Sequence, residues 1–477
     1  MSMADSTHDP GLEAAGQLRA DALGLLGTVS LTAAYMAPAA SLIALFGPMV
    51  IKTGIGAGFV MLLGLAVTLP SAISFGMMAR EMPSAGGVYA WASCVLGRTF
   101  GRWIGITTAI YYVLTVVFPP IVFGQLFNNL LDLADVPTGK GTWLLGAGLS
   151  MLIAGFATYR GVAVSSYLAF VLLIVQLVVM SALALTFAFV AGREQHLSWA
   201  PFLPPAGSWS GALLALPMAM LSLICDAATP VSEETRNAKR TIPLAIILTL
   251  LVVGIWNVLA FGALGMACPP DRLIDLCRNS VDNAVPPLAA LVWGRFNVLV
   301  TVVGMIAMIG ALVPCSTAAS RLLFSLGRDG TLPRGLAVVH PRHRTPWNAL
   351  HIVFLATALA IVPLALIRDP GEAIAWWSQV IAWFIIVVYF TANLCNFLFH
   401  LRFRPERFSI LWNLVAPALA AIIQLAVLWQ VVVLELWRAG WIGISAQFFI
   451  VVVSVLTAGW VYTLCAYRLP ARSGASP

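Results

Sequence analysis

Twelve long apolar runs restrict this chain to one kind of fold. Each run approaches or exceeds the roughly 20 residues that a helix needs to cross the hydrocarbon core of a bilayer. The strands of a membrane β-barrel would instead be about ten residues long, with alternating polar and apolar side chains. We therefore predict an all-α membrane protein with 12 transmembrane helices, at about 24–50, 56–80, 103–128, 143–159, 162–191, 211–231, 242–267, 287–325, 349–367, 374–400, 410–436 and 441–467.

Outside these runs the chain has no polar stretch long enough to form a separate soluble domain. Hydrophobic residues make up 60% of the sequence and charged residues 9%, whereas a soluble domain carries about 25% charged residues. The polar segment 1–23 lacks the basic start and the small-residue cleavage site of a removable signal peptide. We expect this segment to be a cytoplasmic tail, like residues 468–477.

The basic residues are distributed unequally between the two sides of the predicted helices. If the N-terminus lies inside and the helices alternate in direction, 18 of the 26 lysine and arginine residues lie on the cytoplasmic side. Such a bias indicates the orientation of a membrane protein. We therefore predict a multi-pass protein of the cytoplasmic (inner) membrane with both termini cytoplasmic. In this setting the net charge of +7 does not indicate a nucleic acid partner.

The sixth run combines an acid with a proline. Asp226 lies inside the run, and Pro230 follows it. An aspartate at the centre of a membrane helix costs roughly 2.5–3.5 kcal/mol, and proline removes a backbone donor and clashes with the preceding turn. We therefore predict a break or kink near Cys225–Pro230. Because a break is tolerated in the membrane only where it lines a cavity or packs on protein, this stretch is a candidate substrate site. The alternative is a kinked helix in which Asp226 bonds to a neighbour.

The first run has a second candidate interruption at Pro38. Proline suits the first turn of a new half-helix, whose free N–H groups would lie at the positive end of the helix dipole. Such a helix start can bind an anion without a basic residue; the alternative is a simple proline kink. The residues around the two interruptions form the predicted substrate-binding set: Tyr35, Met36, Ala37, Pro38, Ala39, Ala40, Ser41, Ser222, Leu223, Ile224, Cys225 and Asp226.

The two interruptions lie five helices apart, and therefore in halves of opposite orientation. Matched interruptions indicate an inverted repeat with its binding site near the membrane midplane. We predict a first repeat at 24–191, a second repeat at 211–400 and two further helices at 410–467.

A few polar residues in other runs are candidates for ion coupling. Gln176 in the fifth run cannot carry a charge, and we expect it to form a hydrogen bond between helices. Ser316 and Thr317 in the eighth run are expected to bond to the carbonyl groups of their own helix. The alternative for this pair is to supply oxygen ligands to a sodium ion together with carbonyl groups of the first interruption.

Two cysteines lie in the loop after the seventh run, on the side that the predicted topology places outside. The outside is oxidising, so we predict a disulfide between Cys268 and Cys277. No spacing of cysteine, histidine or acidic residues resembles a metal site. We expect neither a metal nor a cofactor.

Several motifs resemble those of the amino acid–polyamine–organocation permeases. They read REMPSAGGVYAW at 80–91, DAATPVSEETRNAKRTIP at 226–243 and SRLLFSLGRDGTLP at 320–333, followed by HP at 340–341 and TPWNAL at 345–350. The resemblance spans the first nine runs, and the motifs are specific when taken together. It implies a LeuT-like five-plus-five fold with helices 1 and 6 broken, and alternating access for amino acids or related amines.

The chain departs from the pattern of that family in both interruptions. Ala37-Pro38-Ala39 stands where the family often has a Gly-x-Gly pattern, and Ile224-Cys225 stands before the acid where the family often has a glycine and an aromatic residue. The aromatic gate is thus missing or is supplied elsewhere, by Tyr111, Tyr112 or Trp383, and we include Tyr111 and Trp383 in the predicted substrate-binding set.

We expect a secondary transporter that moves an amino acid, a small amine or a polyamine by alternating access. Gln176 stands where many proton-coupled members of the family carry a lysine, so Asp226 becomes the best titratable candidate. Proton-coupled symport is the main expectation; an exchanger without ion coupling and a sodium-coupled symporter are the alternatives. A channel would need a continuous polar lining, a sensor would need an output domain, and an enzyme would need a paired acid–base site. We expect a monomer or homodimer within the lipid bilayer.

Overall fold

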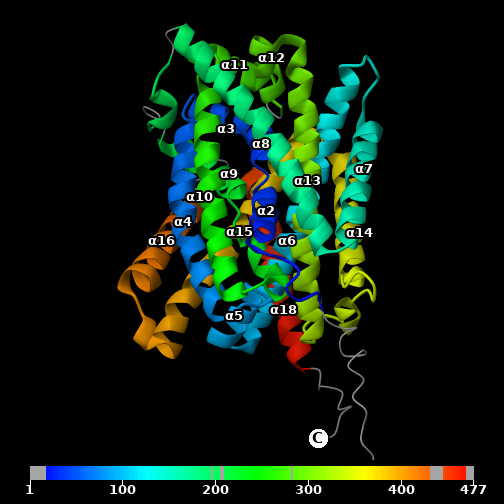
Figure 1. Ribbon diagram of the computed structural model, residues 1–477, viewed down its shortest axis with the longest axis vertical. Helices are drawn as coiled ribbons and strands as arrows, with labels where there is room; N and C mark the ends of the chain where they lie inside the picture. Colours follow the sequence, from blue (N-terminus) through cyan, green and yellow to red (C-terminus); the bar gives the residue numbers. More distant parts are fainter. Residues whose placement is uncertain (1–17, 195–196, 205–208, 281–282, 430–443, 469–477) are drawn as a thin grey trace, which may run out of the picture.

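The computed structural model describes residues 18–194, 197–204, 209–280, 283–429 and 444–468. Within these residues the chain is built of helices, and eleven of them are long and apolar enough to cross a membrane (Figure 1). A further helix, α18 (Ile444–Arg468), contains a shorter apolar stretch, Ile450–Leu464. Part of the predicted eleventh segment, residues 430–436, lies outside the described residues. The protein is therefore an all-α, multi-pass membrane protein, as predicted.

The predicted apolar runs fall on helices throughout the described chain. The long helices and their shorter neighbours are α2 (Leu25–Met36), α3 (Pro38–Thr53), α4 (Ala57–Glu81), α5 (Val88–Val95), α6 (Arg98–Asp132), α7 (Lys140–Tyr159), α8 (Val162–Arg193), α9 (Trp209–Ser222), η2 (Asp226–Glu234), α10 (Ala238–Gly265), α11 (Pro270–Asn279), α12 (Val285–Trp293), α13 (Val298–Arg328), η4 (Arg334–Ala337), α14 (Trp347–Ile367), α15 (Pro370–Phe403), η6 (Ile410–Val415), α16 (Ala416–Trp429) and α18.

The eighth predicted run is two helices rather than one. A short 3₁₀ turn, Gly294–Asn297, separates α12 from α13. Gly294 has a φ of 55°, in the left-handed region that glycine enters at little steric cost. The run looked continuous in the sequence because apolar residues lie on both sides of the turn, so hydropathy alone does not reveal the change in direction.

The first predicted run is also two helices, which meet at a single residue. α2 ends at Met36 and α3 begins at Pro38, and Ala37 between them has φ 45° and ψ 62°. The N–H group of Ala37 donates to the carbonyl oxygen of Ala34 at 3.1 Å. A left-handed conformation costs a residue with a Cβ atom roughly 1–2 kcal/mol. Packing from other helices must therefore hold this junction.

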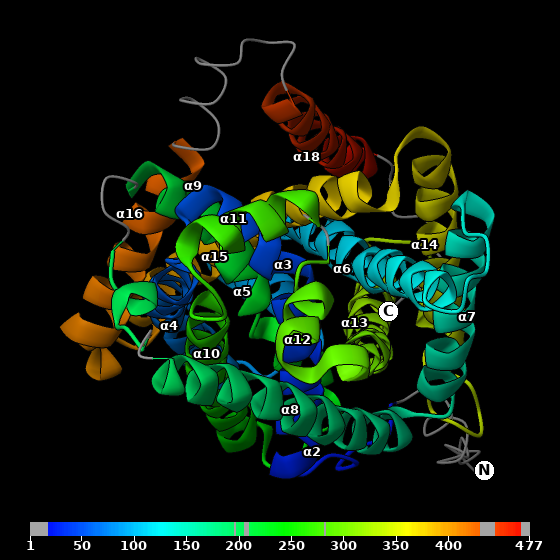
Figure 2. The ribbon, with the colours of Figure 1, turned by 90° about the horizontal axis from the view of Figure 1, so that it is seen from above.

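The interrupted helices lie inside the bundle, and unbroken helices surround them. In the span that contains α9 and η2, 89% of the most apolar window is buried, whereas the corresponding value is 28% for both α8 and α14. α16 and α18 lie at the periphery of the bundle (Figure 2). The fold thus places both interruptions in the protein interior, while α8 and α14 present most of their apolar surface outwards.

The backbone strain at Ala37 can be tested with glycine substitutions. Ala37→Gly removes the Cβ atom that opposes the left-handed conformation. We therefore expect the free energy of unfolding to stay unchanged or to rise by up to about 1 kcal/mol, which would be seen as an unchanged or higher thermal midpoint. Ala44→Gly, inside the regular helix α3 and also buried, is the matched control and should lower stability by about 0.5–1 kcal/mol. Equal losses in the two variants would show that Ala37 is not strained.

Candidate functional site

The first interruption has less free backbone than the sequence suggested. The N–H group of Ala39 donates to Oε1 of Gln176 on α8 at 3.3 Å. The N–H group of Ser41 donates to the carbonyl oxygen of Ala37 at 2.8 Å. The hydroxyl group of Ser41 donates to the carbonyl oxygen of Met36 at 3.1 Å. The expectation of free N–H groups at the start of this half-helix was therefore wrong for Ala39 and Ser41, because the side chain of Gln176 accepts the first and the carbonyl group of Ala37 accepts the second. The expected bond between helices at Gln176 is confirmed.

The second interruption begins earlier than predicted. α9 ends at Ser222, and the 3₁₀ helix η2 starts at Asp226 and runs through Pro230. The irregular residues are therefore Leu223–Cys225 rather than Cys225–Pro230. A 3₁₀ segment in the middle of a membrane run is unusual, because its hydrogen bonds have poorer geometry than those of an α-helix. Here the N–H group of Cys225 donates to the hydroxyl oxygen of Tyr389 on α15 at 3.0 Å.

Asp226 lies at this junction, completely shielded from solvent. Its exposed fraction is 0%. The hydroxyl groups of Tyr111 on α6 and Tyr389 on α15 donate to its Oδ1 atom, at 3.3 and 3.4 Å. The Oδ2 atom has no hydrogen-bond partner within 3.5 Å among the described residues, and the hydroxyl group of Tyr112 is a further neighbour of the carboxyl group. Because an unsatisfied buried carboxylate oxygen is costly, the site is suited to a ligand cation or a proton at Oδ2.

A small apolar cavity lies beside the two interruptions. Its free volume is about 40 Å³, enough for a few water molecules but not for a large ligand without movement of the walls. Most of its wall atoms belong to apolar side chains, and its polar groups come from residues such as Tyr35, Ser41 and Thr115. The lining residues are Tyr35, Met36, Ala37, Ala40, Ser41, Leu45, Thr115, Phe118, Pro119, Leu221, Ile224, Met308, Ala311, Cys315 and Ile381.

The structure brings together only part of the predicted substrate-binding set. Six of its members line the cavity: Tyr35, Met36, Ala37, Ala40, Ser41 and Ile224. Asp226 and Tyr111 are hydrogen-bonded to each other beside the cavity. Tyr35 lies close enough to Asp226 for the charge of the acid to act on its hydroxyl group. The remaining members, Pro38, Ala39, Ser222, Leu223, Cys225 and Trp383, are not in the lining.

Sequence reasoning missed the residue that joins the acid to the second interruption. Tyr389 bonds both to the N–H group of Cys225 and to Asp226, and its ring packs on Phe75 with centroids 4.9 Å apart. The one signal in the sequence is a hydroxyl group within the apolar tenth run. Only the fold shows which of the tyrosines in such runs reaches the acid. Thr115, whose hydroxyl oxygen is 3.3 Å from that of Tyr35, was missed for the same reason.

The hydroxyl groups of the eighth run are used within the protein. Ser316 donates to the carbonyl oxygen of Leu312 at 2.8 Å, and its oxygen is 3.0 Å from that of Thr158 on α7. Thr317 donates to the carbonyl oxygen of Val313 at 2.8 Å. The expectation that these residues bond to their own helix is confirmed.

Cys268 and Cys277 are free thiols in the structure, so the predicted disulfide is not formed there. Cys277 lies on the buried face of the short helix α11 with Leu273, whereas Cys268 precedes that helix. Burial raises the pKa of the Cys277 thiol to about 12, and the neighbouring Cys268 adds to the effect. The two sulfur atoms are neighbours, but the inward direction of Cys277 was not visible in the sequence.

A wider polar depression lies near the ends of α6 and α13. It has a volume of about 580 Å³ and is lined by Gln125, Asn129, Asp132, Leu133, Arg278, Asn279, Ser280, Asn283, Pro286, Pro287, Asn297 and Thr301. α6 and α13 also line the small cavity. Pro119 and Gln125 are six positions apart on α6, and Thr301 and Met308 are seven positions apart on α13, which corresponds to a rise of about 10 Å along each helix.

Three buried residues from α3, α6 and α13 meet close to the linings of the depression and the cavity. A Cβ atom on Gly304 of α13 would come within 2.7 Å of Ile43 Cδ1 on α3 and 2.8 Å of Leu126 Cδ1 on α6. Ile43 and Leu126 are each 1% exposed. We call Ile43, Leu126 and Gly304 the apolar plug.

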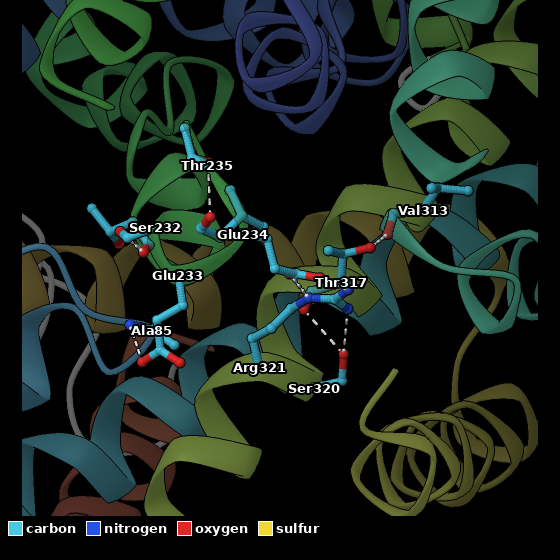
Figure 3. A network of polar contacts seen from close by, with 11 residues as sticks. Ala85, Ser232, Glu233, Glu234, Thr235, Val313, Thr317, Ser320 and Arg321 are labelled. Carbon is cyan, nitrogen blue, oxygen red and sulfur yellow. Dashed lines mark hydrogen bonds and ion pairs between the residues drawn. The ribbon is translucent and has the colours of Figure 1, made fainter. Parts of the chain in front are cut away.

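The opposite end of the site is closed by ion pairs between η2 and α13. Arg321 Nε is 2.8 Å from Glu234 Oε2, and both side chains are 1% exposed. Figure 3 shows Arg321 reaching Glu234 while Glu233, on the same turn, points to the backbone of Ala85. Glu233 also forms two bonds to Arg328, at 2.9 and 3.0 Å. The acids of η2 and the arginines of α13 therefore hold the sixth and eighth membrane segments together at this end.

The chain before α2 strengthens this closure. The N–H group of Leu23 donates to the carbonyl oxygen of Glu234 at 2.9 Å, and the N–H group of Arg236 donates to that of Leu23 at 2.8 Å. Leu23 and Thr235 thus form an isolated parallel bridge. Leu23 precedes α2, and Thr235 directly follows Glu234 at the end of η2. Movement of α2 at this end must therefore either break the bridge or move η2 as well.

Comparison with known proteins agrees with this architecture. Residues 23–474 match the family described as amino acid permease. The chain is 27% identical to the low-affinity putrescine importer PlaP of Escherichia coli K12, over 72% of this chain and 74% of that protein. It is 28% identical to the branched-chain amino acid permease BcaP of Lactococcus lactis, over 90% and 92% of the two chains. It is 26% identical to the methylthioribose transporter of Bacillus subtilis, over 63% and 66%.

The chain therefore belongs to the amino acid permease family, within the amino acid–polyamine–organocation superfamily. Members of this family are membrane transporters and not enzymes. Membership is consistent with the LeuT-like fold, and the chain is a transporter for amino acids or amines.

The buried ion pair can be tested by removing one partner or both. Arg321→Met leaves Glu234 buried without its partner, so we expect a loss of about 3–5 kcal/mol in stability. Glu234→Gln together with Arg321→Met removes both charges and should recover most of that loss. The control Arg328→Gln breaks a partly exposed pair and should cost about 0–1 kcal/mol. Thermal unfolding in detergent measures all three; equal shifts for Arg321→Met and Arg328→Gln would contradict the role given to burial.

Proposed function

We propose that this chain is a proton-coupled importer of an amino acid or monoamine with an apolar side chain. The observation that carries the proposal is Asp226, an acid inside the membrane bundle with one unpartnered oxygen, next to a cavity with apolar walls. The acid anchors the ammonium group or exchanges the proton, and the cavity receives the side chain. In this proposal both termini lie in the cytoplasm, which the distribution of basic residues supports.

The charges inside the described bundle favour a substrate with one ammonium group. Glu234 is already paired with Arg321, which leaves Asp226 as the buried acid beside the cavity. A diamine would place its second ammonium group against side chains such as Leu45, Phe118 and Met308. Burying an unpaired ammonium group in apolar surroundings costs several kcal/mol, so an apolar amino acid or monoamine fits better than putrescine.

Gln176 supports binding of a substrate carboxylate. Its Oε1 atom accepts the N–H group of Ala39, and its Nε2 atom is buried without a hydrogen-bond partner among the described residues. A carboxylate at the start of α3 would be a stronger acceptor than a neutral amide. It would take the Ala39 N–H group, accept from Nε2 of Gln176, and gain from the helix dipole at this end.

The two closures differ in strength, and this difference supports alternating access. The apolar plug (Ile43, Leu126 and Gly304) separates the polar depression from the cavity by about 10 Å of helix, without a charge in the three residues. The other end is held by the pair of Arg321 with Glu234 and by the bridge of Leu23 with Thr235. We propose that substrate enters from the polar depression past the plug and that release requires the ion-paired end to open.

The contacts favour proton coupling over sodium coupling. The hydroxyl groups of Ser316 and Thr317, which were the candidate sodium ligands, donate to carbonyl oxygens of α13. Sodium would need several oxygen ligands from both α13 and the first interruption, whereas a proton needs only the unpartnered Oδ2 atom of Asp226. An exchanger without ion coupling is the second candidate, since exchange requires no titratable group at all.

Asp226→Asn tests the coupling in proteoliposomes. An inward proton gradient should stimulate uptake of the wild-type protein, and Asp226→Asn should reduce uptake at least about tenfold and abolish the stimulation, since the amide cannot exchange a proton. Asp271→Asn, an exposed acid of α11, is the control and should behave like the wild type. If wild-type uptake does not depend on the proton gradient but requires substrate preloaded inside the vesicles, the protein is an exchanger and not a proton symporter.

Competition for uptake tests the substrate class. We expect branched-chain amino acids or apolar monoamines to compete at least about tenfold better than putrescine, because the second ammonium group of a diamine has no anionic partner in the cavity. Phe118→Asp, which places an acid in the cavity wall, should reduce the difference in competition between the apolar substrates and putrescine. If putrescine competes best in the wild-type protein, the apolar walls do not face the bound substrate.

A further inference from the structure

A basic pocket lies at the ion-paired end of the bundle, away from the substrate cavity. It has a volume of about 480 Å³ and is lined by Leu18, Arg19, Ala20, Arg160, Arg342, His343 and Arg344. These residues come from the chain before α2, the α7–α8 junction and the loop before α14. Three segments far apart in the sequence thus place four arginines around one depression, and its lining contains no acidic residue.

The positive charge of this pocket is poorly compensated by the protein. Arg19, Arg160 and Arg342 form no ion pair with any acid in the described part of the chain. Desolvation, followed by the positive charges of His340, Arg342 and Arg160, lowers the pKa of His343. Like charges are thus brought together here, and three of the four arginines have no acidic partner among the described residues, which is typical of a site for an external anion.

The rim of the pocket continues into apolar surface at the end of the membrane helices. Phe156, one turn before Arg160 on α7, is 62% exposed, and the guanidinium group of Arg160 lies 4.4 Å above its ring. Leu26 on α2 and Tyr167 on α8 are 65% and 72% exposed. The pocket therefore lies where a phosphate group and acyl chains could be bound together. Basic pockets between membrane helices bind acidic lipid headgroups in this way.

We propose that this pocket binds the phosphate group of an acidic phospholipid, such as phosphatidylglycerol or cardiolipin. Guanidinium groups match phosphate oxygens in planar, two-point contacts, and the arginines come from three separate segments. A bound headgroup would join the chain before α2 to the α7–α8 junction and to the loop before α14. It would thereby stabilise the end of the transporter that the Arg321–Glu234 pair closes.

Native mass spectrometry of the full-length protein tests the site. The protein is purified in detergent and titrated with phosphatidylglycerol, cardiolipin or phosphatidylcholine. We expect the acidic lipids to be retained, and the variant Arg160→Gln with Arg342→Gln to retain them about tenfold less. The matched control, Arg240→Gln with Arg402→Gln, removes two exposed arginines outside the pocket and should retain them like the wild type. Equal retention by both double variants, or of phosphatidylcholine, would overturn the proposal.

The imidazole group of His343 provides a second measurement inside the pocket. A bound phosphate group should raise its pKa, because an anion favours the charged imidazolium form. With the histidines isotopically labelled, the pH titration of His343 is followed by NMR with and without acidic lipid in the detergent micelles. No change in the pKa of His343 on lipid addition would contradict binding in this pocket. An equal rise with inorganic phosphate alone would assign the pocket to a soluble phosphate ion and overturn the lipid assignment.

Discussion

Two side chains that reach the backbone at the helix interruptions support the rest of this structure. Inside a membrane, a broken helix exposes N–H and carbonyl groups that no water can satisfy. Gln176 accepts the N–H group of Ala39, and Tyr389 accepts that of Cys225. Both side chains come from outer or neighbouring helices, so each interruption is stabilised by tertiary packing. The cavity exists beside these junctions because the helices cannot pack regularly there.

Asp226 links this backbone chemistry to function. Tyr389 bonds to the interruption and to the acid, and Tyr111 bonds to the same oxygen. The proposed protonation of Asp226, or binding of a cation to it, would therefore act on the contacts that hold α6, α15 and η2 together. η2 ends at Glu234, whose pair with Arg321 closes one end of the bundle. The 3₁₀ segment η2 therefore connects the proposed binding site to that closure.

Charged side chains are distributed unequally between the interior of the bundle and its ion-paired end. The interior beside the cavity carries one acid, while the end formed by η2, α13 and the chain before α2 carries paired acids and an excess of arginines. The buried pair of Glu234 with Arg321 holds helices together, and the arginines around Arg160 face outwards with little compensation from the protein. The same residue type therefore serves an internal contact in one place and, as proposed, an external lipid in the other.

The sequence by itself determined the class of fold and, to within a few residues, two of the places where the helices are interrupted. Run lengths, Pro38 and the acid at Asp226 are local features, and membrane physics leaves few ways to accommodate them. The sequence did not reveal that Tyr389 and Tyr111 meet at Asp226, that Gln176 takes the N–H group of Ala39, or that the eighth run turns at Gly294. Which side chains converge depends on how helices distant in the chain are rotated and packed, and hydropathy carries no information about that rotation.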